Sequence, residues 1–213
     1  MKKLILILIL GISSLQVFAG GEQYMNAMKK AVAASDTAAS ASSLQNLSNQ
    51  FQRIANVERT EWLPYYYAAY CIAGSAFVLK DKSKLDDYLD NAEALIKLAD
   101  SLSPNNSEIY TIKAMINQGR IAVSPMSRGR KYGTISNELI KKAMELDSTN
   151  PRPYLLKGTG LFYTPSMFGG GKDKAKPILD ICVKKYDAFK SANEIVPHWG
   201  RDRAVKMLEE CNK

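Results

Sequence analysis

Apolar residues recur along this chain at helical spacing, and the helices themselves repeat about every 44 residues. Each repeat opens on a tyrosine that is followed four positions later by a small residue: Tyr65/Ala69, Tyr110/Ala114 and Tyr154/Gly158. The helices between them repeat a bulky residue and an alanine at a spacing of 44: Phe51/Ala55, Leu95/Ala99 and Leu139/Ala143. Helix pairs with small residues at fixed positions are typical of units that stack on copies of themselves. The pattern predicts an all-α fold, a right-handed α-solenoid.

The repeat length and the predicted helix-cap residues divide the chain into about four helix pairs and a C-terminal capping helix. The first pair is expected over 23–34 and, with Asp36 or Thr37 as the cap, up to Asn56. The later helices are expected at 61–78, 84–102, 107–123, 131–146, from 151 to a break at Thr164-Pro165, 172–189 and 201–211. Residues 124–133 form a long basic connection in this prediction. Pro177 is expected in the first turn of its helix, because farther inside it would kink that helix.

The first 19 residues have the features of a secretory signal peptide. Lys2 and Lys3 precede an apolar run over 4–10, and Val17-Phe18-Ala19 offers small residues for cleavage before Gly20. The run is far shorter than the roughly 20 residues of a membrane span. No cysteine follows the run, which disfavours a lipoprotein. We therefore expect one domain over 20–213, in the periplasm or secreted, not membrane-spanning.

Charge is unevenly spread along the mature part. Residues 20–112 carry 8 basic and 11 acidic side chains, a net charge of −3, whereas residues 113–213 carry 19 and 10, a net charge of +9. An anionic partner for the second half is one interpretation: an acidic protein face, a phosphorylated glycolipid or a membrane surface. The other interpretation is that the lysines lie on solvated helix faces and bind no partner. Export argues against nucleic acid, and the oligomeric state is left open.

The cysteine count is odd, with Cys71, Cys182 and Cys211 in the mature part. An oxidising compartment permits a disulfide, but at least one thiol stays free or joins another chain. Cys71 lies in the apolar segment AAYCIAG and is expected to be buried. Whether Cys182 and Cys211 form a disulfide is left open.

The second helices of the pairs resemble those of tetratricopeptide repeats, in which alanine, a bulky apolar residue, alanine and proline follow one another at fixed spacing. The matching sets are Ala92/Ile96/Ala99/Pro104, Ser136/Ile140/Ala143 and Ala175/Leu179/Cys182. The repeat is about ten residues longer than the 34 of that family, so the resemblance is to a divergent member. The strings FQRIANVERTEWLPYYYAAY, NPRPYLLKGTGLFYTPSMFGGGKDKA and VPHWG are similar to exported Gram-negative bacterial proteins with degenerate repeats of this kind. The resemblance implies a tetratricopeptide-like solenoid and names no activity.

Two segments share a frame and form the candidate contact surface. SPMSRG and TPSMFG lie 40 residues apart, and equivalent loops of a solenoid emerge on the same edge, so we expect them side by side. A glycine-rich turn before a helix can bind an anion through free N–H groups. A nucleotide P-loop is excluded, because Ser166 and Asp173 replace its glycine and hydroxyl residues. The candidate partner or anion contacts are Arg128, Arg130, Lys131, Phe168, Gly169, Gly170, Gly171 and Lys172.

No motif predicts catalysis, a metal site or a cofactor. His198 is the only histidine and has no cluster of acidic ligands around it. Trp199 is expected to pack the final helix on the last repeat. The first functional hypothesis is a non-enzymatic adaptor that binds a protein or peptide partner through the solenoid surface. The second is a module of an uptake or sensing system that binds a small anionic ligand at Gly169–Lys172 with Arg128 and Arg130.

Overall fold

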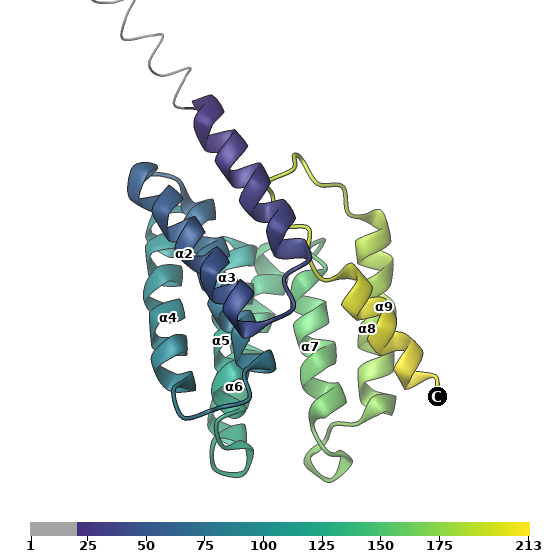
Figure 1. The fold of residues 1–213 in the computed structure, drawn as a ribbon. Helices are drawn as coiled ribbons and strands as arrows, with labels where there is room; N and C mark the ends of the chain where they lie inside the picture. The colour runs from purple at the N-terminus through teal and green to yellow at the C-terminus, as the bar shows by residue number, and fades with distance from the viewer. Residues whose placement is uncertain (1–20) are drawn as a thin grey trace, which may run out of the picture.

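Every regular element in residues 21–213, the range that the computed structural model describes, is helical (Figure 1). The prediction of an all-α fold is confirmed. A helix over 21–36 comes first, and the predicted signal peptide lies outside the described residues. The following elements are α2 (Ala41–Val57), α3 (Trp62–Val78), α4 (Leu85–Leu102), α5 (Ser107–Ile121), α6 (Pro125–Leu146), α7 (Arg152–Tyr163), a 3-10 turn at Ser166–Phe168, α8 (Lys172–Ala188) and α9 (Arg201–Cys211).

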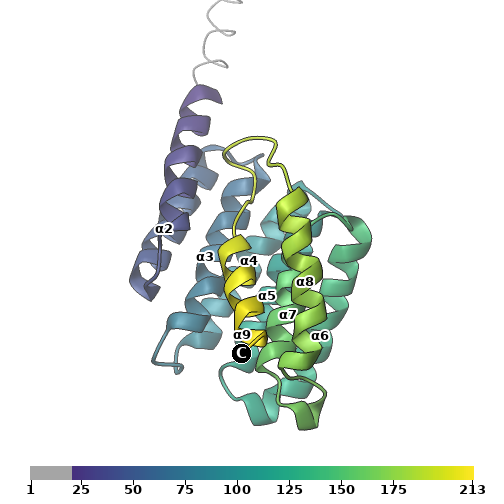
Figure 2. The same ribbon diagram turned by 90° about the vertical axis from the view of Figure 1, so that its right-hand side faces the viewer.

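The helices stack in the order expected of a solenoid. Consecutive helices pack on each other, and α3 also contacts α5, which in turn contacts α7. Helices α3, α5 and α7, which open the last three pairs, therefore form one row, with α9 packed on α8 at the end (Figures 1 and 2). The right-handed twist and the kinship with tetratricopeptide repeats stay predictions.

The recurrent small residues lie where helices meet. Ala55, Ala69, Ala99, Ala114 and Ala143 are all buried, with exposed fractions of 1% or less. Small side chains allow two helix backbones to approach closely, and bulky neighbours then fill the remaining space. The repeat of about 44 residues is thus a repeat of helix-helix contacts.

Gly158 is the tightest of these positions in the row of opening helices. A Cβ atom at Gly158 would lie 2.6 Å from Cδ2 and 2.8 Å from Cγ of Leu179 on α8. Gly158→Leu is expected to destabilise the protein by about 1–3 kcal/mol or more, because the added side chain forces α7 and α8 apart. Thermal melts read by circular dichroism measure the effect. Gly129→Leu is the control, since a Cβ there meets nothing within 4 Å; equal melting temperatures for the two variants would contradict the packing account.

A buried polar network fastens the C-terminal segment to the ends of α3, α5 and α7. Arg152 is 2% exposed, and its Nη2 lies 2.6 Å from Oε1 of Glu108. Glu108 also accepts hydrogen bonds from the Tyr66 hydroxyl at 2.8 Å and from the Asn150 amide at 2.7 Å. The Trp199 indole N–H donates to Tyr66 Oη at 2.9 Å. One carboxylate therefore connects three helices and the chain just before α9.

Two predicted helix starts and the predicted position of Pro177 are wrong. Helix α2 begins after Ser40, whose side chain and Ser43 form a capping box, and neither Asp36 nor Thr37 caps it. Helix α6 begins at Pro125, a favoured first helical residue, so most of the predicted basic connection is helix. Pro177 lies inside α8 and beyond its first turn. Pro177 and Asp173 are both exposed, so water can bond the Asp173 carbonyl group that proline leaves without a helical donor.

Candidate functional site

The α6–α7 groove is an open hollow of about 860 Å³ between helices α6 and α7, within the size range of small-molecule sites. Helix α5 and the end of α3 contribute to its lining, and residues 164–169 close it beyond α7. Four large apolar side chains that the fold leaves exposed line it: Phe77 (38% exposed), Met126 (88%), Tyr163 (69%) and Phe168 (62%). Apolar surface gathered in a hollow marks an interaction site.

Two glycines of α6 line this groove with nothing packed against them. Gly129 and Gly133 are one helical turn apart, and a Cβ added to either would meet no atom within 4 Å. Glycine inside a helix costs roughly 0.5–1 kcal/mol relative to alanine. Packing explains Gly158 but does not explain these two residues. Their effect is to leave a bare stretch of helix backbone that a flat molecule can approach.

The charged residues of the groove are Arg130 on α6 and Lys157 on α7. Neither forms an ion pair with any residue in 21–213. Arg128, predicted to belong to the same contact surface, instead holds Asp86 of α4 with Nη1 at 2.7 Å and Nη2 at 2.9 Å. This hydrogen-bonded pair lowers the pKa of the Asp86 carboxyl group. Arg128 therefore joins α4 to α6, and its guanidinium group is already paired within the protein.

The three glycine N–H groups predicted to bind an anion are already bonded within the loop. The N–H groups of Gly169, Gly170 and Gly171 donate to the carbonyl oxygens of Ser166, Pro165 and Leu161 at 2.9, 3.3 and 2.8 Å. Glycine is required at 170 because a Cβ there would lie 2.1 Å from the Thr164 carbonyl oxygen. These N–H groups close the loop on itself and are not free for a ligand.

The remaining predicted contacts divide between the groove and the outer surface. Phe168 and Gly169 line the groove. The Lys131 ammonium lies 5.1 Å from the Tyr132 ring and that of Lys172 lies 5.9 Å from the Phe162 ring, both outside the lining. The segments SPMSRG and TPSMFG line the same hollow, which Pro125, Met126 and Gly129 share with Pro165 and Phe168.

Phe77, Lys157 and Tyr163 are among the lining residues that were not predicted from the sequence. Phe77 and Tyr163 lie at the ends of α3 and α7, and Lys157 lies on the exposed side of α7; both helices were predicted from their buried faces. The sequence signal that could have indicated them is the shared frame of SPMSRG and TPSMFG, since it predicts a common edge beside the end of α7.

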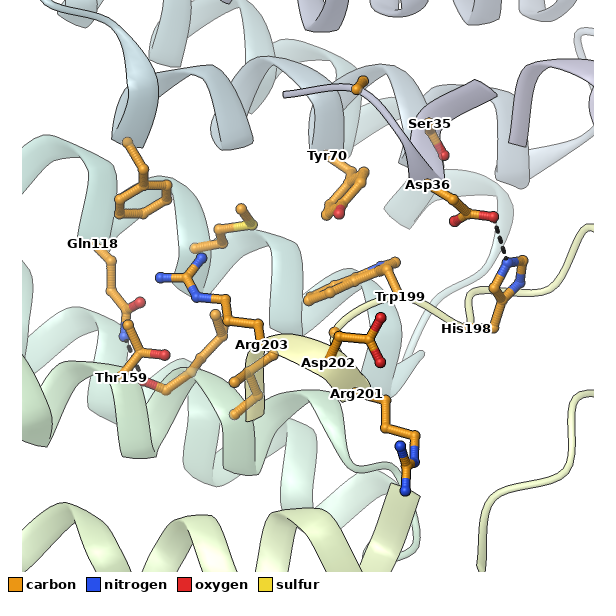
Figure 3. Close-up of a pocket in the computed structure, with 16 residues that line it drawn as sticks. Ser35, Asp36, Tyr70, Gln118, Thr159, His198, Trp199, Arg201, Asp202 and Arg203 are labelled. Carbon is orange, nitrogen blue, oxygen red and sulfur yellow. Dashed lines mark hydrogen bonds and ion pairs between the residues drawn. The ribbon is translucent and has the colours of Figure 1, made fainter. Parts of the chain in front are cut away.

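Figure 3 shows the residues that line a second hollow, of about 370 Å³, which shares three lining residues with the groove. It lies between the turn after the first helix, α3, α7 and the start of α9. His198 Nε2 is 3.2 Å from Oδ2 of Asp36, and Trp199 stacks on Tyr70 with ring centroids 4.7 Å apart. Trp199 thus packs on α3 of an early pair as well as on the last pair. No cluster of three histidine, cysteine or acidic residues suited to a metal ion occurs among the described residues.

The three cysteines are free thiols. Burial raises the pKa of Cys71 and that of Cys182 to about 12 each, and the Cys182 thiol donates to the Pro151 carbonyl oxygen at 3.4 Å. Only Cys211 is partly exposed. We expect a thiol reagent at pH 8 to label Cys211 within minutes and the other two only after unfolding, because the thiolate is the reactive form. Peptide mass spectrometry reads the sites; equal labelling of Cys182 and Cys211 in the folded protein would contradict the burial.

None of the helices described here is long and apolar enough to cross a membrane. The fold and the groove define an all-helical protein with one open, largely apolar hollow joined to a smaller one. No protein-family model matches the chain, and no curated protein matches it.

One solved structure resembles it closely: the HusA haemophore from Porphyromonas gingivalis, with a TM-score of 0.80 and 37% sequence identity. The match covers 88% of this chain and 92% of that chain. The chain belongs to the family of this haemophore.

Proposed function

We propose that this protein is an exported binding protein that holds haem, an anionic tetrapyrrole, in the α6–α7 groove. The observation that carries the proposal is the bare helix face at Gly129 and Gly133 beside exposed apolar side chains, in a relative of the HusA haemophore. Of the two hypotheses drawn from the sequence, the comparison favours the small-ligand module over the protein adaptor. The adaptor stays a prediction, with no observation of its own in its favour.

The chemistry of the groove suits haem. A tetrapyrrole is a flat ring with two apolar faces and two carboxylate groups on one edge. The glycines of α6 leave room for a ring, while Tyr163 and Phe168 offer aromatic surface for stacking. Arg130 and Lys157 provide positive charge at the groove for the carboxylates. Met126 and Tyr163 also carry the side-chain types that can ligate haem iron.

Titration of the purified protein with haem, followed by the absorption of the tetrapyrrole, tests the proposal. We expect a saturable change with one site per chain, and competition by iron-free protoporphyrin if ring contacts provide most of the affinity. A linear, unsaturable change would contradict the proposal. A crosslinking pull-down from the native envelope tests the adaptor separately: one dominant protein captured by a chain that binds no haem would favour it.

A further inference from the structure

The α6–α7 groove and the second hollow meet at a junction lined by Phe77, Gln118 and Thr159. All three residues border both hollows. The junction is therefore the part of the groove that lies nearest to the second hollow and the start of α9. The polar groups of the junction favour one orientation of an asymmetric ligand in the groove.

Arg203 of α9 supplies the charge at the junction. Its guanidinium carbon lies 5.8 Å from the centre of the Phe77 ring. Figure 3 shows the guanidinium group reaching from α9 toward Gln118, whereas Arg201 points the opposite way. Arg201 is committed to Asp187, with Nη2 at 2.7 Å from Oδ1. Arg203 has no hydrogen bond or ion pair with any residue in 21–213.

The carboxylates of the second hollow do not neutralise Arg203. Asp36 lies beside His198, with 3.2 Å between Oδ2 and Nε2. The carboxylate of Asp202 points toward the Trp199 side of the hollow, away from the Arg203 guanidinium (Figure 3). The guanidinium therefore faces the junction as an unpaired cation.

Two uncharged hydrogen-bond donors, the side chains of Thr159 and Gln118, lie beside the Arg203 guanidinium group. The Thr159 side chain is 5% exposed, and its hydroxyl donates only to the thioether sulfur of Met207, at 3.5 Å. A thioether is a weak acceptor, so this hydroxyl can turn to a stronger one at little cost. Gln118 Nε2 donates to the Leu156 carbonyl oxygen at 3.0 Å and carries a second N–H. An almost fully buried hydroxyl without a good acceptor is a second, independent sign that the junction is built for an acceptor group.

We propose that the junction is a carboxylate subsite in which Arg203, Thr159 and Gln118 bind one propionate of the tetrapyrrole. This inference rests on the proposed function, because it specifies how the ligand is oriented in the groove. The propionate bound there faces the junction, and the ring lies in the groove beside α6. A charge-assisted bond of guanidinium to carboxylate is among the strongest available to a protein.

Binding of haem and of haem dimethyl ester, in which both carboxylates are blocked, tests the subsite. Arg203→Gln is expected to weaken haem binding by about ten- to a hundredfold and to leave ester binding unchanged. Thr159→Val is expected to show the same selectivity with a smaller loss. Arg201→Gln is the matched control, with the same change of charge on the same helix, and is expected to bind both ligands as the wild type does.

The outcomes separate the subsite from the function. The subsite is overturned, while the function stands, if the wild type and Arg203→Gln bind haem equally well. The same holds if Arg203→Gln loses as much affinity for the ester as for haem. If the wild type binds neither ligand, both are overturned. Thermal melts of each variant show whether any loss reflects unfolding.

Discussion

Gly133→Leu is expected to weaken haem binding by on the order of 10- to 100-fold or more while making the fold slightly more stable. A leucine side chain at this position would fill the space beside α6 that the ring is proposed to occupy. The same change replaces a helical glycine where nothing lies within 4 Å, so the free energy of unfolding should rise by roughly 0.5–1 kcal/mol. The two effects have opposite signs, which a general loss of structure cannot produce. Absorption titration and urea unfolding measure them on one preparation.

Glu138→Leu is the control for that experiment. Glu138 is an exposed residue of the same helix and does not line the groove. The variant places the same leucine side chain on α6 outside the groove and should leave haem affinity within a factor of about two. Unchanged haem binding by Gly133→Leu would exclude the α6 face of the groove as the binding site.

Glu108→Ala is expected to destabilise the protein by about 3–5 kcal/mol, because it leaves the buried guanidinium of Arg152 without its counter-charge. The loss also removes the acceptor of Tyr66 and Asn150, so α3 and the start of α7 lose their common hydrogen-bonding partner on α5. Urea unfolding at pH 7 measures the change. Where this variant does not fold, Glu108→Gln retains an acceptor oxygen and is expected to show a smaller, measurable loss.

Glu145→Ala provides the comparison for an exposed pair. Glu145 lies 3.8 Å from Lys141 on the surface of α6, where such a pair contributes about 0–1 kcal/mol. A similar small loss for Glu108→Ala would show that the buried network does not hold the C-terminal segment in place. Arg203 belongs to that segment, so a loosened Glu108 variant is also expected to bind haem more weakly.

The helical core could be predicted from the sequence because burial at helix contacts follows a local period. Ala99, Ala114 and Gly158 stood out by their spacing, and all three are buried. The start of α6 could not be predicted in the same way. Gly129 and Gly133 lower the helix propensity of that stretch, so it resembled a loop, and the contact that secures it joins Arg128 to Asp86, 42 residues away.

The candidate site was predicted only in outline. The shared frame of SPMSRG and TPSMFG correctly indicated one surface, because equivalent positions of a stack face the same side. The direction of the N–H groups at Gly169–Gly171 depends on how the loop closes on Leu161, which no motif records. The approach of Arg203 to Phe77 depends on where α9 docks, and residues so far apart in sequence carry no local sign of it.

The methyl signals of the methionines offer the most direct measurement of the central claim, that the ligand lies in the α6–α7 groove. Met126 lines the groove, Met115 lines the second hollow, and Met28 lies in the core with an exposed fraction of 0%. In a spectrum of methyl-labelled protein with zinc protoporphyrin, a diamagnetic stand-in for haem, ring currents shift only nearby methyl groups. We expect the largest shift at Met126, a smaller one at Met115 and none at Met28. Saturable binding without a shift at Met126 would contradict the account.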